Sequence, residues 1–358
     1  MLSRREMLRR AALLTLGAVA LDACGKQADT PVAQVEPTRL TAAPTAPPTV
    51  TAPAIPPTDT LATVTSTHAP AAEPAVTVTR VPPSPTPDQA YLAVVRGANP
   101  EAITRAAVDA LGGMGRFVHA GDDVIVKPNI CIASYGPEYG ATTNPAVVAA
   151  VVKMCLEAGA ARVRVIDLPF SGTAAEAYKI SGIAAAVEAA GGKMEIPNMG
   201  KYVDTKFPAT ARNIKNWLIY QDVLKANALI NLPIAKVHDA SGLTLGMKNL
   251  MGIVRNRSDM HLSLHQRIAD LSTVVKPVLN IVDGVRVLTQ HGPQGGNLDW
   301  VLNANTVIAS HDIIAADAYA AQLFFKTRPD KVGYIKLGDE MGLGKMDLTG
   351  LNVKEVSV

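Results

Sequence analysis

The sequence has few cysteines, few aromatic residues and no marked excess of either charge. Three Cys in 358 residues exclude a disulfide-stapled scaffold. They also cannot supply four thiolates, so an iron–sulfur cluster held by this chain alone is not expected. Basic residues number 34 and acidic residues 31, which excludes a nucleic-acid binder that acts by bulk electrostatics. Aromatic residues, at 4%, are too sparse for a surface that stacks bases or sugars.

Three short motifs of common enzyme classes are also missing. The sequence contains no Cys-x-x-Cys pair, no Gly-x-x-x-x-Gly-Lys-Ser/Thr loop and no Gly-x-Ser-x-Gly turn. These absences argue against a thiol redox protein, a P-loop nucleotidase and an α/β-hydrolase.

The N-terminal region has the pattern of an export signal. Arg4-Arg5 precedes an apolar run over residues 11–21, which is too short to span a bilayer as a helix. The arginine pair resembles a twin-arginine signal, and Leu-Asp-Ala-Cys ending at Cys24 resembles a lipobox. We predict a signal peptide over 1–23, lipidation of Cys24 and an extracytoplasmic, membrane-anchored lipoprotein. Cleavage elsewhere or an uncleaved anchor are the alternatives.

A Pro/Thr/Ala-rich segment follows the signal. Residues 31–87 hold 14 of the 25 Pro, and no helical or strand period survives them. The pattern indicates a disordered tether over 24–87. A structural domain over 88–358 is predicted after it.

Short apolar runs alternate with helical patterns in the predicted domain. This alternation is typical of an α/β fold with a mostly parallel sheet and helices on both faces. The predicted strands are Tyr91–Val95, Val124–Val126, Val163–Ile166, Ala228–Asn231, Asn280–Val282 and Thr306–Ala309. The predicted helices are Pro100–Leu111, Pro145–Ala158, an Ala-rich helix that ends near Ala190, and one after Asp312.

Polar side chains follow several of these predicted strands. In open parallel sheets, ligands bind at the carboxyl edge. A single acid after a strand more commonly caps the next helix, but five such positions on one edge favour a ligand site. The five are Lys127, Asn129, Asp167, Asp283 and Asp312.

The densest polar segment runs from residue 231 to residue 265 and mixes glycines, cations and imidazoles. Lys236 and Lys248 suit an anionic ligand, together with Asn249. His238 is a candidate acid/base group. His261 and His265 are four apart, so on one helix they would share a face as metal ligands, although a solvated helix face gives the same spacing.

Two further features extend the candidate site. Residues 291–297 form a Gly-rich segment, which is either a lid over a ligand or a plain surface connection. Asp312 is expected to cap the helix that follows it, and Asp317 faces either the core or the site.

Taken in order, these residues resemble the family of proteins with domain of unknown function 362. The resemblance covers about residues 120–325. The matching segments are Lys127–Asn129, Thr143–Pro145, Leu229–His238, Leu243–Gly252 with Lys248-Asn249, His261, Ile281–Gly284, Gly292-Pro293 and Ser310–Asp317. Many relatives carry a ferredoxin-like module, which this sequence lacks.

A more distant likeness is to the lactate racemase family. His238, then Ser241-Gly242, Lys248 and a later His at 261 or 265 is similar to that family's site pattern. The likeness implies a nickel-type cofactor bound through the Lys and hydride transfer at a hydroxy-acid carbon.

These observations predict a metal- or cofactor-dependent enzyme, an oxidoreductase or isomerase, that acts on a small anionic molecule. His238 and Lys248 are the candidate catalytic residues, and His261 and His265 the candidate metal ligands. The alternative is a ligand-binding lipoprotein without chemistry, which would tolerate loss of His238 and His261. The sequence specifies neither the substrate nor the oligomeric state.

Overall fold

The computed structural model describes residues 84–358. The predicted signal peptide 1–23, Cys24 and all but the last four residues of the predicted tether lie outside the described residues. Within the described part, every helix is too short or too polar to cross a bilayer.

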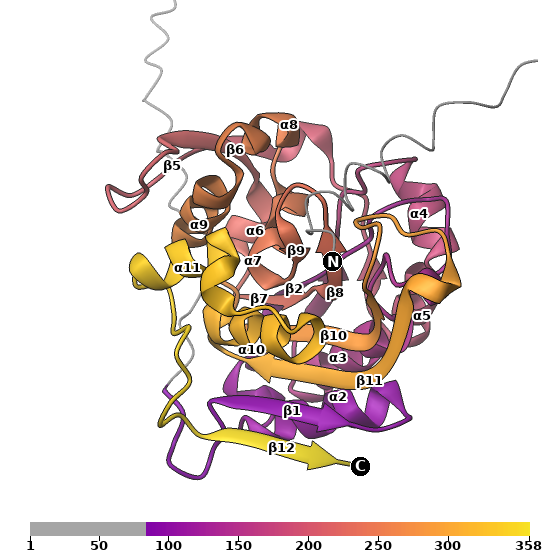
Figure 1. Cartoon of the computed structure of the whole chain (residues 1–358). Helices are drawn as coiled ribbons and strands as arrows, with labels where there is room; N and C mark the ends of the chain where they lie inside the picture. The colour runs from indigo at the N-terminus through magenta and orange to yellow at the C-terminus, as the bar shows by residue number, and fades with distance from the viewer. Residues whose placement is uncertain (1–83) are drawn as a thin grey trace, which may run out of the picture. The chain divides into compact units, whose positions relative to one another are not determined.

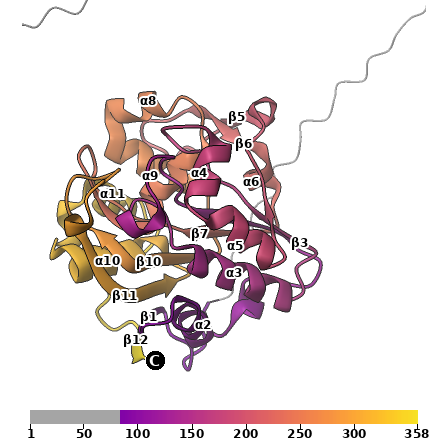
Figure 2. The same ribbon diagram turned by 90° about the vertical axis from the view of Figure 1, so that its right-hand side faces the viewer.

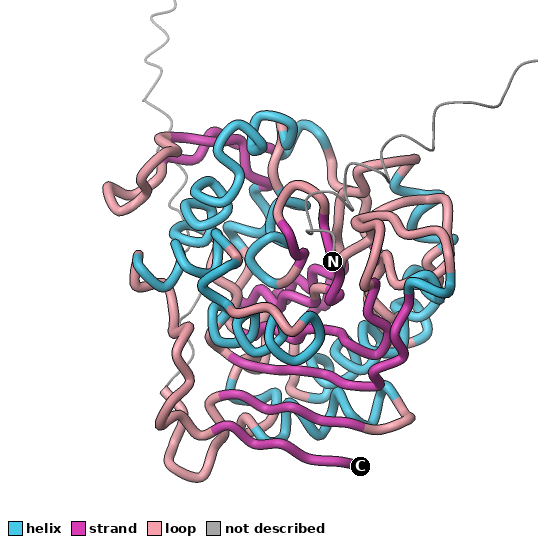
Figure 3. The backbone as a smooth tube through the Cα atoms, viewed as in Figure 1, coloured by secondary structure: helices cyan, strands magenta, loops and turns pink. Residues whose placement is uncertain are grey.

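The described residues form one large mixed sheet and one small hairpin (Figure 1). The strands are β1 (Leu92–Arg96), β2 (Asp123–Pro128), β3 (Arg162–Val165), β4 (Lys193–Met194), β5 (Tyr202–Lys206), β6 (Asn216–Tyr220), β7 (Ala228–Leu232), β8 (Ile234–His238), β9 (Gly242–Thr244), β10 (Leu279–Leu288), β11 (Val301–Ser310) and β12 (Val353–Ser357). Figure 3 shows the β5–β6 hairpin apart from the large sheet.

The large sheet has the order β12-β1-β11-β10-β7-β2-β3-β4, and β8 pairs with β10 and β9. Its pairings are parallel except where β11 meets β10 and β1, and where β9 meets β8. Strands β10, β7, β2 and β3 therefore point the same way, and their carboxyl ends share one edge. The predicted mostly parallel sheet is confirmed.

Helices cover both faces of the sheet (Figures 1 and 2). They are α2 (Pro100–Ala110), α3 (Pro145–Glu157), α4 (Ala174–Ile180), α5 (Ile183–Ala189), α6 (Gln221–Lys225), α7 (Gly246–Asn249), α8 (Arg257–Met260), α9 (Leu264–Val274), α10 (Ile313–Phe325) and α11 (Gly333–Glu340). Buried side chains of α2, α3 and α5 form one apolar cluster with the sheet, and those of α7, α9, α10 and α11 form a second. Alternate residues of one strand serve both: Val124 and Val126 belong to the first cluster, Ile125 to the second.

Several helices begin where the sequence places an N-cap. Asn144 accepts the backbone N–H of Ala146 at 2.9 Å, and Pro145 occupies the first helical turn of α3. Asp312 caps α10 by accepting the N–H groups of Ile314 and Ala315.

The structure differs from the predicted elements in two places. The Ala-rich helix is two helices, α4 and α5, because the chain turns at Gly182, whose φ of 71° favours glycine. The strand predicted to end at Val282 continues as β10 to Leu288, so Asp283 lies inside a strand. Nothing in the apolar pattern marked that continuation, because β10 includes Asp283, Gly284 and Arg286.

Candidate functional site

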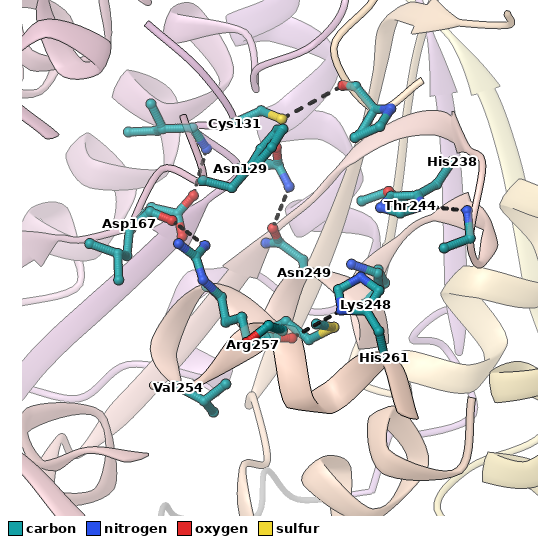
Figure 4. A pocket seen from close by; sticks show the side chains of 18 of the residues that line it. Asn129, Cys131, Asp167, His238, Thr244, Lys248, Asn249, Val254, Arg257 and His261 are labelled. Carbon is teal, nitrogen blue, oxygen red and sulfur yellow. Dashed lines mark hydrogen bonds between the residues drawn. The ribbon is translucent and has the colours of Figure 1, made fainter. Parts of the chain in front are cut away.

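A cavity of about 830 Å³ opens at the carboxyl edge of the sheet. Its lining comes from the ends of β2, β3 and β8, from α7, and from the segment between α7 and the start of α9. The polar and charged residues that line it are Lys127, Asn129, Asp167, Lys236, His238, Asp239, Thr244, Lys248, Asn249, Arg255, Asn256, Arg257, Ser258 and His261. Figure 4 labels eight of them: Asn129, Asp167, His238, Thr244, Lys248, Asn249, Arg257 and His261.

The floor of the cavity is a buried ion pair. The ammonium of Lys127 donates to Asp167 at 2.8 Å and to the side-chain oxygen of Asn249 at 3.2 Å. Asp167 also accepts the N–H of Ile130 at 2.6 Å. Burial lowers the pKa of Lys127, and the charge of Asp167 offsets part of that shift. Both carboxylate oxygens of Asp167 are therefore hydrogen-bonded within the protein.

One glycine makes this floor possible. A Cβ at Gly252 would lie 2.1 Å from an oxygen of Asp167 and 2.7 Å from the Lys127 ammonium. Only a residue without a side chain lets the backbone after α7 approach the ion pair so closely.

Lys236 is a second buried cation, held by three oxygens and no acid. Its ammonium donates to the side-chain oxygen of Asn129 at 3.1 Å, to the carbonyl of Ala141 at 2.7 Å and to the carbonyl of Pro293 at 3.1 Å. Pro293 reaches it because Gly292 packs against β8, where a Cβ would lie 1.9 Å from the Val237 carbonyl oxygen. The positive charge of Lys236 remains uncompensated at the cavity wall.

Lys248 is the third lysine of the cavity and differs from the other two. It lies on α7, is partly exposed, and has no hydrogen-bond or ion-pair partner among residues 84–358. Burial, followed by the nearby charge of Lys236, lowers its pKa to about 8. Its amine therefore gains and loses a proton close to neutral pH.

The start of α7 is fixed by a buried carboxylate. Asp317 accepts the N–H of Gly246 at 2.6 Å and of Met247 at 2.9 Å. Burial raises the pKa of Asp317 to about 7. Through these two bonds Asp317 positions the helix that presents Lys248 and Asn249 to the cavity.

The two cavity histidines offer different atoms to a ligand. His238 accepts the N–H of Ala240 at Nδ1, so its neutral tautomer, assigned from this bond, carries hydrogen at Nε2. Burial and the charges of Lys248 and Lys236 lower the pKa of His238 to about 3. His261 Nδ1 lies 3.0 Å from the carbonyl of Arg257, so Nδ1 donates and Nε2 is an acceptor. His238 is thus an uncharged donor near neutral pH.

Two arginines complete the basic lining. Arg257 donates to the carbonyls of Leu168 and Pro169, both at 2.8 Å, which fixes its guanidinium at the cavity wall. Arg255 lies near the outer wall, with its guanidinium 5.6 Å from the ring centroid of Tyr202.

Seven of the predicted site residues line this one cavity, together with one of the two predicted metal ligands. They are Lys127, Asn129, Asp167, Lys236, His238, Lys248, Asn249 and His261.

Three predicted ligand-binding carboxylates do not line the cavity. Asp283 lies inside β10 and is fully buried, where it accepts the N–H groups of Asn144 and Val285. Asp317 holds α7 as described. Asp312 caps α10 at the opposite edge of the sheet, because β11 runs antiparallel to β10 and Ser310 pairs with Asn280. The expectation that all five strand-end residues share one edge is therefore wrong for Asp312, whereas Asp283 lies inside β10 and not beyond its end.

The predicted histidine pair does not form. His261 lies in a short 3-10 helix and His265 in α9, and Ser263 between them leaves the helical conformation with φ −148° and ψ 56°. His265 instead stacks on Tyr334, with ring centroids 6.0 Å apart. Within residues 84–358, no three His, Cys, Asp or Glu side chains come close enough together to hold a metal ion. Side chains of the described residues therefore do not by themselves supply a complete set of ligands for a metal ion at this site.

Several lining residues were not predicted from the sequence. Cys131, Phe170 and Met199 all line the cavity. Cys131 and Phe170 follow β2 and β3 within a few residues of Asn129 and Asp167, so the strand-end argument could have found them. Cys131 and Cys155 are free thiols.

The fold and the cavity define an α/β protein with a cavity, lined mainly by basic side chains, at the carboxyl edge of a mostly parallel sheet. The chain belongs to the family described as Domain of unknown function (DUF362), which matches residues 124–322. That match contains all of the cavity lysines and both cavity histidines.

Two other proteins are similar to this chain. It is 28% identical over 225 residues to the thylakoid-associated protein sll1697 of Synechocystis sp. (strain ATCC 27184 / PCC 6803 / Kazusa), covering 60% of this chain and 67% of that protein. It also resembles the lactate racemase apoprotein from Thermoanaerobacterium thermosaccharolyticum, with a TM-score of 0.38 and 13% identity over 69% of this chain. The chain spans 56% of the length of that apoprotein.

Proposed function

We propose that this protein is an enzyme that binds a small anionic molecule in the cavity and exchanges a proton with it through Lys248. The proposal rests on the position, the missing partner and the pKa of Lys248. Its amine lines the cavity, has no partner among residues 84–358, and has a pKa of about 8. An unpaired ammonium group that lines a cavity can bind an anionic group of a ligand.

The charge balance of the cavity supports an anionic ligand. Among residues 84–358, five basic and two acidic side chains line the cavity. One of the acids, Asp167, is bound to Lys127. Lys236 and Lys248 are left without a carboxylate, and a carboxylate or phosphate group would gain from both.

The roles of the groups follow from their protonation. Lys236 attracts the anion with a charge that its oxygen cage holds in place. His238 donates from Nε2 without adding charge. Lys248 is the acid/base group, because a pKa of about 8 gives it both protonation forms near neutral pH. Proton removal beside a carboxylate, as in an isomerisation, is the reaction class that this arrangement favours.

A nickel-type cofactor is the second candidate. It rests on the sequence resemblance of His238, Lys248 and His261 to the lactate racemase pattern, and on the presence of all three side chains in one cavity. Such a cofactor would supply hydride chemistry. Elemental analysis of protein purified from its native host tests this candidate, and protein that is active without nickel would exclude it.

Membrane anchoring is part of the proposal and rests on residues 1–24 alone. Cys24→Ala should release the protein from the detergent phase or leave unprocessed precursor. Unchanged partition of that variant would remove the lipoprotein assignment.

Proton exchange tests the enzyme proposal without a known substrate. A panel of small 2-hydroxy acids, 2-oxo acids and phosphate esters is incubated with the protein in D₂O, and deuterium entry at carbon is followed by NMR. Wild type should exchange at least one member, and Lys248→Met should not. Lys354→Met, a change at an exposed residue on edge strand β12, is the matched control. Binding without exchange would favour the non-catalytic binding protein.

A further inference from the structure

We infer that the ligand is amphipathic: an anionic head at Lys236 and Lys248, joined to an apolar or aromatic body that covers a wall formed by Phe170 and Met199. This inference rests on the proposed function and specifies its substrate class.

The wall consists of two apolar side chains that line the same cavity as the lysines of β8 and α7. Phe170 is 51% exposed and Met199 is 49% exposed, although both line the cavity. Large apolar side chains that stay exposed at the wall of a charged pocket mark a surface that a ligand covers. The cavity lining also includes the apolar residues Ile130, Leu168, Met251 and Val254.

The backbone at Phe170 and the side chain of Met199 are both anchored within the fold. The backbone N–H of Phe170 donates to the carbonyl of Cys131 at 2.9 Å, which ties the segment after β3 to the segment after β2. The sulfur of Met199 lies 3.4 Å from a guanidinium nitrogen of Arg255. That guanidinium also lies over the ring of Tyr202. The wall is thus part of the folded site.

The volume of the cavity also supports an amphipathic ligand. A volume of about 830 Å³ lies toward the upper end of small-molecule pockets, which enclose most of the ligand surface. A two- or three-carbon acid, or free phosphate, would occupy the basic end and leave Phe170 and Met199 in water. An anion with an apolar body would satisfy both ends.

A homologous series of ligands separates head from body. Straight-chain carboxylates of increasing length are titrated calorimetrically into the full-length protein, with phosphate monoesters of the same chains as a second arm. Affinity should rise about three- to fourfold with each added methylene until the wall is covered. The series that binds more tightly, the carboxylates or the phosphate monoesters, identifies the head group. Alcohols of equal length should bind at least about tenfold more weakly.

Variants assign the effect to the wall. Phe170→Ala combined with Met199→Ala should flatten the dependence on chain length and leave the affinity of the shortest member unchanged. Leu298→Ala, which removes an equally exposed apolar side chain outside the cavity, should change neither.

The two hypotheses fail differently. Lys248-dependent binding of the short anions, with no gain from longer chains, overturns the amphipathic ligand and leaves the proposed function intact. Alcohols that bind as well as the acids overturn the anionic head. Absence of any Lys248-dependent binding overturns both.

Discussion

The ammonium of Lys127 lies 2.8 Å from a carboxylate oxygen of Asp167, and both side chains are almost completely buried beneath the cavity. A buried pair of this kind is costly to break, because the remaining partner keeps its desolvation penalty without compensation. The pair therefore forms the floor of the cavity. In the proposed function, Lys236 and Lys248 interact with the ligand.

Removing one partner should destabilise the fold. Asp167→Ala leaves the Lys127 ammonium and the Ile130 N–H without their acceptor, so we expect the free energy of unfolding to fall by about 3–5 kcal/mol. Urea denaturation measures the change. Asp330→Ala breaks an exposed pair with Arg328 and should be barely measurable. Equal effects of the two substitutions would show that the buried pair is not structural.

The close approach at Gly252 gives a second prediction. Gly252→Ala places a methyl group against both members of the pair, so we expect a loss of about 1–3 kcal/mol from overpacking together with weaker anion binding. Gly115→Ala is the control, because an added Cβ there meets nothing within 4 Å. A Gly252→Ala protein as stable as the control would contradict the packing described.

Lys248 should behave as a site residue. Lys248→Ala removes a cation that has no hydrogen-bond or ion-pair partner among residues 84–358, so stability should not fall by more than about 0.5 kcal/mol. Anion affinity should fall about tenfold to a hundredfold, since a charge-assisted hydrogen bond is lost. Thermal melting and calorimetry on the same samples separate the two effects. A large loss of stability with unchanged affinity would make Lys248 structural.

The pKa of Lys248 sets a pH dependence. Only the charged amine attracts an anion, so affinity for a fully ionised ligand should be constant below about pH 7.5 and fall as pH rises through 8. His238, with a pKa of about 3, does not titrate in this range. Lys248→Arg should hold its charge and flatten the curve. A wild-type affinity that is unchanged from pH 7 to pH 9.5 would contradict the assignment.

The free energy of unfolding of the ligand-free protein should rise over the pH range in which the anion affinity falls. The folded-state pKa of Lys248 is about 8 and its ordinary value is 10.5, so the unfolded chain binds more protons between these values. The contribution of Lys248 to the free energy of unfolding therefore rises with pH across that window. Comparison with Lys248→Met isolates it, and identical pH profiles of the two proteins would rule it out.

Part of the site could be predicted from strand ends alone. Lys127 lies at the end of β2, Asn129 and Asp167 follow the neighbouring parallel strands β2 and β3, and local sequence patterns identify both strands. The argument was wrong for Asp312, because the direction of β11 depends on its long-range pairing with β10. No local pattern distinguishes a parallel strand from an antiparallel one.

The histidine pair shows a second limit. A spacing of four residues places two side chains on one face only if the helix is continuous between them. At Ser263 it is not, because packing of His265 against Tyr334 and Gly333 fixes α9 separately from the turn that carries His261. The apolar wall was also missed, because Phe170 and Met199 are distant in sequence and only the fold brings them to one cavity.

The central claim, a cavity of positive potential open to small anions, can be tested at Cys131, whose thiol lines the cavity. Alkylation rates with iodoacetate and iodoacetamide are measured by peptide mass mapping, and their ratio is compared with that of a small neutral thiol. Cys155, which is fully buried, should stay unmodified as an internal control. The account predicts a ratio at Cys131 at least about tenfold above the free thiol, falling in high salt and in Lys248→Ala. A ratio equal to or below that of the free thiol would contradict it.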